Sequence, residues 1–151
     1  MTQLSSGAKT VCSQNVKDWG SVVDSLRQAY YRAVGDIVRT IHQAGVSVLA
    51  GTDGPGGCLT AGWSLHKELE SLVSSGLTPL EALRAATIEP ARFLGLADSL
   101  GTVRVGMVAD LVLLDANPLD DIRNARRITG VMADGRYRGN RVRVSSFPRA
   151  H

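Results

Sequence analysis

Residues 46–57, with the sequence VSVLAGTDGPGG, place a short apolar segment directly before a glycine-rich loop. Residues 46–50 are mostly apolar or β-branched, which predicts a strand buried on both faces. In α/β proteins, reactive groups gather at the carboxyl ends of such strands, so Asp53 is the first candidate for chemistry. The alternative is a turn aspartate that hydrogen-bonds to its own loop backbone.

Helical patterns lie on both sides of this segment. Apolar residues recur at steps of three and four between positions 22 and 41, which predicts an amphipathic helix that ends near Gly45. A second stripe, from Leu65 to Val73, predicts a helix that ends at Gly76. Together with the loop, residues 22–75 are expected to form a helix-strand-loop-helix unit, which is half of an α/β repeat.

Two further helix starts follow, and then the pattern changes to strands. Thr78-Pro79-Leu80-Glu81 combines a threonine cap, a proline at the first helical position and a glutamate three residues after the cap. Glu89-Pro90 predicts a short helix that ends at Gly95. Strands are expected over residues 100–104, 109–114, 128–132 and 136–144, separated by turn residues such as Asp134-Gly135.

Length and composition narrow the class of protein. The 151 residues fit one domain or two small ones, and a complete (β/α)₈ barrel of about 250 residues does not fit. Hydrophobic residues at 44% and charged residues at 21% are typical of a globular chain. No apolar run approaches the ~18 residues that span a bilayer, and residues 1–14 lack an export signal. Because Cys12 and Cys58 form no disulfide framework, we expect a cytoplasmic location.

Positive charge is concentrated at the C-terminal end. The chain has a net charge of +3, but residues 1–121 carry −4 and residues 122–151 carry +7. The arginines of this end are Arg123, Arg126, Arg127, Arg136, Arg138, Arg141, Arg143 and Arg149. They support the hypothesis of a nucleic-acid or acidic partner. The spacing of two within the pairs 136/138 and 141/143 suits a solvated strand face equally well, and aromatics for base stacking are few.

Five sequence blocks, in this order, resemble the C-terminal third of the metal-dependent amidohydrolases. The blocks are VLAGTDG (48–54), LHKELE (65–70), GLTPLEAL (76–83), AT with PARFLG (86–95), and a segment from Gly106 through ADLVLLDANPL (109–119). The imidazolonepropionase-like and prolidase-like branch matches best. Each block alone is a weak motif, and the common order of all five makes the resemblance specific.

This resemblance implies a distorted (β/α)₈ barrel flanked by a β-sandwich, and hydrolysis of a C–N bond by metal-activated water. The chain would then hold a lead-in (1–18), the last barrel helix-strand-helix unit with connecting helices (19–97), sandwich strands (98–145) and a tail (146–151). Asp53 matches the aspartate that closes the eighth barrel strand, touches the metal and accepts a proton. Zinc is the expected metal, and a small amide, lactam or dipeptide is the expected substrate.

The remaining ligands that the resemblance implies are absent from this sequence. The chain has no His-x-His pair, and its only histidines are His42, His66 and His151. A zinc site usually needs three or four protein ligands, so Asp53 with at most His66 falls short. We therefore expect an incomplete barrel that is inactive alone. It could instead be a non-catalytic module that oligomerises or complements another chain.

Other side chains near Asp53 have two interpretations each. The resemblance allows His66 to contact substrate, whereas a helix-start histidine commonly packs or bonds locally. Cys58, His66 and Asp53 could be imagined as a nucleophilic triad, although closeness in sequence is not geometry. Trp63 could line a pocket or simply pack. His42, on an amphipathic helix, is expected to be structural.

Overall fold

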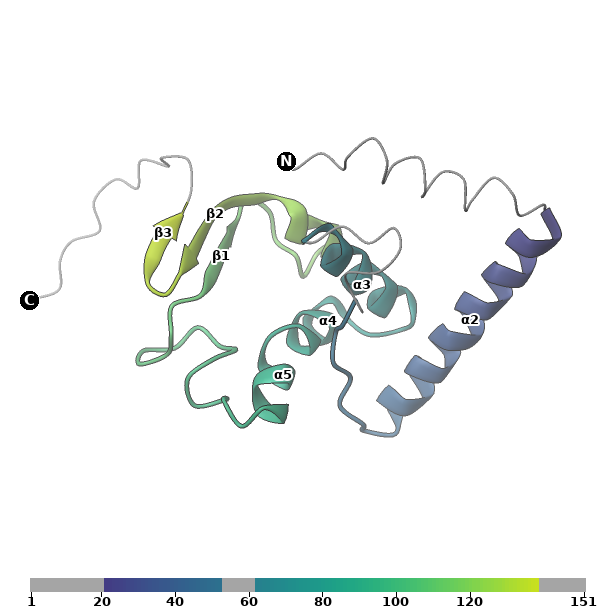
Figure 1. Cartoon of the computed structure of the whole chain (residues 1–151), viewed down its shortest axis with the longest axis horizontal. Coiled ribbons are helices and arrows are strands. Elements are labelled where there is room, and N and C mark those ends of the chain that lie inside the picture. The colour runs from purple at the N-terminus through teal and green to yellow at the C-terminus, as the bar shows by residue number, and fades with distance from the viewer. Residues whose placement is uncertain (1–20, 53–61, 139–151) are drawn as a thin grey trace, which may run out of the picture.

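A computed structural model of the chain describes residues 21–52 and 62–138. The elements in order are the helices α2 (Ser21–Gln43), α3 (Trp63–Ser74), α4 (Pro79–Ala85) and α5 (Ile88–Phe93), then β1 (Leu111–Leu114), the 3₁₀ helix η1 (Ile122–Arg126), β2 (Ile128–Ala133) and β3 (Arg136–Arg138). Figure 1 shows α2 at one end of the molecule and the sheet toward the other, with α3, α4 and α5 between them. The lead-in, the tail and both cysteines lie outside the described residues.

The four predicted helices are confirmed, with small shifts at their ends. α2 ends before Gly45, whose φ of 81° turns the chain away. At α4 the capping box forms as predicted: the Glu81 N–H donates to Thr78 Oγ1 at 3.3 Å, and the Thr78 N–H donates to Glu81 Oε2 at 2.7 Å. α5 begins at Ile88, one residue earlier than expected.

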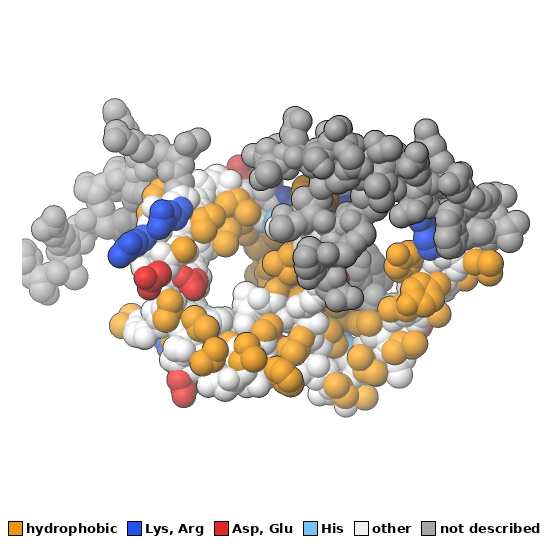
Figure 2. All heavy atoms as spheres, in the orientation of Figure 1, with side chains coloured by type: hydrophobic (Ala, Val, Ile, Leu, Met, Phe, Trp, Pro, Cys, Tyr) orange, Lys and Arg blue, Asp and Glu red, His pale blue; other side chains and the backbone are white. Residues whose placement is uncertain are grey.

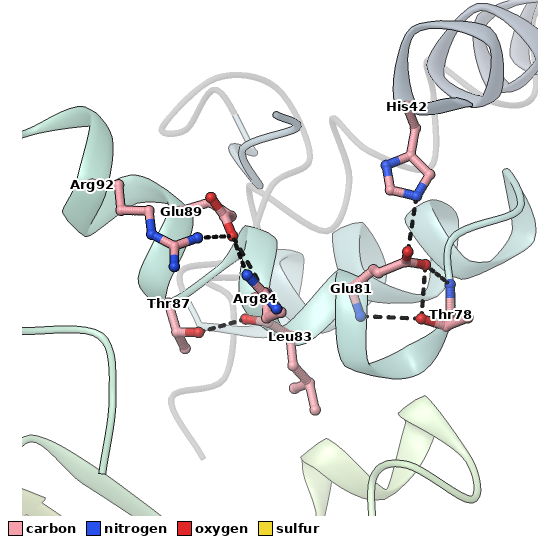
Figure 3. A network of polar contacts seen from close by, with 8 residues as sticks. All are labelled: His42, Thr78, Glu81, Leu83, Arg84, Thr87, Glu89 and Arg92. Carbon is pink, nitrogen blue, oxygen red and sulfur yellow. Dashed lines mark hydrogen bonds and ion pairs between the residues drawn. The ribbon is translucent and has the colours of Figure 1, made fainter. Parts of the chain in front are cut away.

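Polar contacts join α2 to α4 and hold α5 in place (Figure 3). His42 Nε2 lies 3.2 Å from Glu81 Oε1. The glutamate that caps α4 therefore also contacts a side chain in the last turn of α2. The backbone and side-chain hydrogen bonds from Thr78 hold the pKa of Glu81 below its usual range. Arg84 and Arg92 both bind Glu89 Oε1, at 3.1 and 2.8 Å.

The apolar core lies between α3, α4 and η1. Its buried members are Leu69, Leu72, Leu77, Ala82, Ala85, Ile122 and Ala125. Ala82 and Ala85 are 0% and 1% exposed, and these small side chains let the backbone of α4 approach its neighbours closely. Val38 of α2 packs against the edge of this core. The core therefore connects the helices to the 3₁₀ turn that precedes β2.

The prediction of a strand at residues 46–50 is wrong for the described structure. The segment is extended but belongs to no sheet, and the Ala50 N–H donates instead to the Ala85 carbonyl at 2.9 Å. Val48 and Ala50 pack against the core, whereas Val46 and Leu49 are 54% and 38% exposed. A strand needs a neighbouring strand to satisfy its backbone groups, and the described part of the chain supplies none here.

The sheet is antiparallel and has the order β1-β2-β3. Leu111 pairs with Met132 and Val131 pairs with Arg138, and the register of β1 shifts between Leu113 and Leu114. The predicted hairpin turn at Asp134-Gly135 is confirmed, with φ values of 50° and 70°. The prediction over 136–144 is confirmed at 136–138, and residues 139–144 lie outside the described part.

Two details of the C-terminal part of the described chain, residues 100–126, were not predicted correctly. Residues 100–104 form a bend followed by irregular backbone and not a strand, because no strand pairs with them in the described structure; Val103 is 86% exposed. The 3₁₀ helix η1 was missed, and it begins where Asp121 Oδ1 accepts the Arg123 N–H at 2.9 Å. No described helix is both long and apolar enough to cross a membrane.

The bend at Gly101 yields a test of how residues 100–104 pack on α5. Gly101 has a φ of 88°, and a Cβ there would lie 2.7 Å from the Ile88 Cα at the start of α5. Gly106 has nearly the same φ, 89°, with nothing within 4 Å of its Cβ position. We expect Gly106→Ala to lower the free energy of unfolding by about 1 kcal/mol, because alanine disfavours a positive φ and no neighbouring atom adds a clash. Gly101→Ala should cost at least about 1 kcal/mol more.

Urea denaturation of both variants measures this difference. Equal losses of unfolding free energy for the two variants would contradict the close packing of residue 101 on α5.

Candidate functional site

Asp53, the predicted metal-contacting and proton-accepting residue, lies outside the described residues. The described chain reaches Thr52 at the end of the extended segment and resumes at Gly62, directly before α3. Cys58 also lies in the intervening segment, so the triad hypothesis is untested. The described structure next to Asp53 in the sequence is the helix α3.

A metal site is not completed by the described residues. Within residues 21–52 and 62–138, no three histidine, cysteine, aspartate or glutamate side chains lie together in a way that could hold a metal ion. The described residues therefore do not by themselves fit the zinc that the amidohydrolase resemblance implies.

One polar cluster lies on the first turns of α3 and includes His66. Trp63, His66 and Glu70 follow one another at spacings of three and four, which places them on one face of the helix. Arg126 of η1 lies over the Trp63 ring, with its Cζ atom 4.4 Å from the ring centroid, and forms an ion pair with Glu70. The Trp63 and His66 rings meet edge to face, with centroids 6.5 Å apart and planes at 69°. Trp63 therefore packs, although it remains 49% exposed.

The environment of His66 favours a neutral imidazole. Burial, and then the positive charge of Arg126, hold the pKa of His66 below its usual range. Its Nδ1 atom is buried and has no hydrogen-bond partner in the described part of the chain. An imidazole that is neutral at pH 7 can donate one hydrogen bond and accept one. Substrate contact by His66 remains a prediction.

The arginine-rich end is partly neutralised by ion pairs. Arg123 binds Asp121 at 2.6 Å, Arg127 binds Asp115 at 2.7 Å, and Arg126 binds Glu70. These contacts occupy arginines that a nucleic-acid surface would need free. Arg136 and Arg138 lie on β3 and are exposed, and the last three arginines, at positions 141, 143 and 149, lie outside the described residues.

A separate cavity of about 230 Å³ lies at the other end of the extended segment. Residues 45–48 and Leu77 line it together with His42, Glu81, Arg84 and Glu89. It opens beside Val46, where the segment begins, whereas Asp53 follows the end of the segment.

Sequence reasoning missed the roles of Arg126 and Glu70. The spacing of Trp63, His66 and Glu70 on one helical face could have suggested a shared partner. Nothing local identifies that partner as Arg126, which lies 56 positions after Glu70 in the sequence.

Comparison with known proteins gives the class of this chain. The sequence model of the amidohydrolase family matches residues 32–138, which are most of the chain and include α3, α4, α5 and the whole described sheet. This protein belongs to the amidohydrolase family.

Individual relatives agree with this assignment. An ochratoxinase of Aspergillus niger is 34% identical over 122 residues, which are 80% of this chain and 23% of that protein. An imidazolonepropionase of a Geobacillus species is 41% identical over 78 residues, which are 51% of this chain and 18% of that protein.

Solved structures share the fold. The structure of a Xaa-Pro dipeptidase with bound methionine superimposes with a TM-score of 0.64 at 31% identity, covering 71% of this chain and 26% of the other. A bottromycin amidohydrolase gives a TM-score of 0.71 at 26% identity, covering 89% of this chain and 30% of the other. The chain thus spans about a quarter of the length of these relatives.

The lowered pKa of His66 leads to a prediction about stability and pH. The folded state resists protonation of His66, so the neutral imidazole contributes to the free energy of unfolding. This contribution is fully present above about pH 6.5, the ordinary pKa of histidine. It is lost progressively as the pH falls from there toward the lowered folded pKa. We expect His66→Gln to flatten the pH dependence between about pH 7.5 and 5.5, as urea denaturation would measure. If His66→Gln leaves the slope of unfolding free energy against pH unchanged, the lowered pKa of His66 is refuted.

Proposed function

We propose that this chain forms the C-terminal part of an amidohydrolase active site that hydrolyses the C–N bond of a small molecule. The observation that carries the proposal is the family match over residues 32–138, which includes Asp53 and the helix that follows it. In architectural terms, residues 19–97 would supply the last barrel unit and residues 98–145 strands of the flanking sandwich. A cytoplasmic location is part of the proposal.

Asp53 is the proposed catalytic and metal-contacting residue. A divalent metal, zinc above all, would supply acidity to a bound water in the complete site. The Asp53 carboxylate would accept a proton from the attacking water and deliver it to the departing amine. The other metal ligands would come from sequence that precedes the matched segment in the family. The proposal implies that this chain alone is inactive, because its sequence has three histidines and no His-x-His pair.

The substrate class is proposed from the relatives. The names imidazolonepropionase and Xaa-Pro dipeptidase describe enzymes that act on a lactam-like ring and on a dipeptide. A small amide, lactam or dipeptide is therefore the proposed substrate, with His66 as a proposed contact. A neutral imidazole on the first turns of α3 could accept a hydrogen bond from a substrate N–H without adding charge.

A chimera tests the role of Asp53. Residues 32–138 of this chain would replace the corresponding segment of the Aspergillus niger ochratoxinase, which supplies the rest of a barrel. We expect the soluble chimera to retain zinc and the activity of its parent, and Asp53→Asn to reduce kcat/KM at least about a hundredfold. The 151-residue chain alone should hydrolyse nothing under the same conditions.

Asp98→Asn, an identical change at an exposed position, is the control for the chimera. If the Asp53→Asn chimera retains turnover within about threefold of the unsubstituted chimera, the catalytic role of Asp53 is refuted.

A second candidate function is an interaction module that oligomerises or complements another chain. The apolar stripe of α2 favours it, because Leu26, Tyr30 and Ile37 are 64%, 64% and 61% exposed. Figure 2 shows hydrophobic side chains gathered along α2 and over the helices α4 and α5 on the face in view. Charges of both signs flank the stripe on α2, including the Arg39–Asp36 ion pair at 2.9 Å.

This module would associate through the stripe on α2. We expect the purified chain to sediment as more than a monomer at about 100 μM, and Ile37→Glu to weaken that association at least about tenfold by placing a charge in an apolar contact. The control is Gln28→Glu, which adds the same charge on the face of α2 opposite to the stripe. Sedimentation velocity measures both variants, and equal behaviour of the two would contradict the role of the stripe.

A further inference from the structure

We propose that residues 46–50 pair edge to edge with the same residues of a second copy of this chain. The two segments run antiparallel and form a two-stranded sheet across a two-fold axis at Val48. This inference rests on the second candidate function, self-association, and assigns to it a surface other than the stripe on α2. It does not depend on Asp53 or on catalysis.

The backbone of this segment is bonded along one edge only. In an extended chain, the N–H and C=O groups of successive residues point toward opposite edges. The Ala50 N–H donates to the Ala85 carbonyl at the end of α4, so the groups of Val48 and Ala50 belong to the edge that faces α4. The groups of Ser47 and Leu49 lie along the other edge, which we call the open edge. They have no hydrogen-bond partner among residues 21–52 and 62–138.

The open edge is accessible from solvent. Ser47 is exposed and Leu49 is 38% exposed, whereas Val48 packs against the core. Because side chains alternate between the two faces of an extended chain, Val48 holds the segment on the core while Ser47 and Leu49 share the outer face. The segment can therefore accept a strand at the open edge without leaving its place in the fold.

The sequence of this segment carries none of the usual protection of an exposed edge. Soluble proteins guard such edges with lysine or other charges, with proline or with bulges. Residues 43–52, with the sequence QAGVSVLAGT, contain no charged residue and no proline, and Val46 and Val48 favour an extended backbone. No charge repulsion therefore opposes two copies that approach through this edge. Short uncharged apolar segments of this kind pair readily with copies of themselves.

The spacing of the open edge fits a second copy. In an antiparallel pair, residues that exchange two hydrogen bonds alternate with residues that exchange none. With the two-fold axis at Val48, Ser47 lies opposite Leu49 of the partner subunit, and symmetry repeats the same pair. Both pairs use the groups of the open edge, and Val48 occupies the non-bonded position between them. Every N–H and C=O group of the open edge then has a partner.

Disulfide trapping in the full chain tests this register. Cys12→Ser and Cys58→Ser remove the native thiols. One chain then carries Ser47→Cys and a second, isotope-labelled chain carries Leu49→Cys, so that intact mass distinguishes mixed dimers from like dimers. Bonded antiparallel residues have Cα atoms about 5.5 Å apart, which a disulfide can span. Diagonal neighbours are about 7–8 Å apart, which is too far.

We expect mixed dimers to exceed each like dimer at least about tenfold, where random collision gives about twofold. Every chain also carries Ile37→Glu, which removes association through the stripe on α2. The control pairs Leu49→Cys with Val105→Cys, because Val105 is fully exposed and collides freely with solvent-borne partners. This control pair should give the yields of random collision.

Two combinations of charges test the same register without cysteine. Ser47→Lys with Leu49→Glu places opposite charges across both pairs of the dimer, whereas Ser47→Lys with Leu49→Lys places like charges there. Both side chains are exposed, so we expect both combinations to fold as the parent does, which circular dichroism checks. In the Ile37→Glu background, sedimentation velocity should show dimers at least about tenfold tighter for the opposite charges than for the like charges.

Three results would overturn the inference. Like dimers in equal or greater yield than mixed dimers would show that the segments do not meet in this register. Yields no higher than those of the Val105→Cys control would show that they do not pair. Equal affinities for the two charge combinations would show the same without cysteine. None of these readouts involves metal or turnover, and Ile37→Glu removes the stripe on α2, so this inference and each proposed function can fail separately.

Discussion

The packing of α3 on α4 and η1 is the constraint on which the rest of the described structure depends. Leu69 and Leu72 are 4% and 5% exposed, and burying a leucine side chain contributes about 1.5–3 kcal/mol. Ile122 and Ala125 are the members of this core that come from the C-terminal half, and none comes from β1, β2 or β3. In the described structure, η1 packs in this core and leads directly into β2, so a contact that fixes η1 to α3 affects both the helices and the sheet.

This core is small, and much apolar surface remains outside it. α2 meets the other elements largely through polar contacts: His42 with Glu81, and the Arg39 Nε–H with the Ser75 carbonyl at 3.2 Å. Its apolar stripe faces away from these contacts and stays exposed. Large exposed apolar surfaces of this kind often mark sites of association. The extended segment at residues 46–50 has backbone groups that a neighbouring strand could bond, and it joins no sheet in the described part of the chain.

Sequence reasoning succeeded where the signal is local and failed where it is not. The capping box of Thr78 and Glu81 and the Asp134-Gly135 turn were predicted correctly, because each depends on residues within a few positions of one another. The strand predicted at 46–50 failed because pairing needs a distant partner, and β propensity says nothing about whether one is present. The ion pair between Glu70 and Arg126 was not predicted for the same reason: these two residues meet only once the core has formed.

Family membership and catalytic competence are separate properties of this chain. The amidohydrolase match covers residues 32–138, but a barrel active site draws its ligands from the ends of several strands. The described residues contain no complete ligand group, and one carboxylate after one segment cannot hold a metal alone. The described residues that follow that position in the sequence form the helix α3, where the pKa of His66 lies below its usual range and Arg126 contacts Trp63 and Glu70. Structure that positions a catalytic group serves catalysis only together with a full set of ligands, so the proposed activity depends on metal ligands that the described residues do not supply.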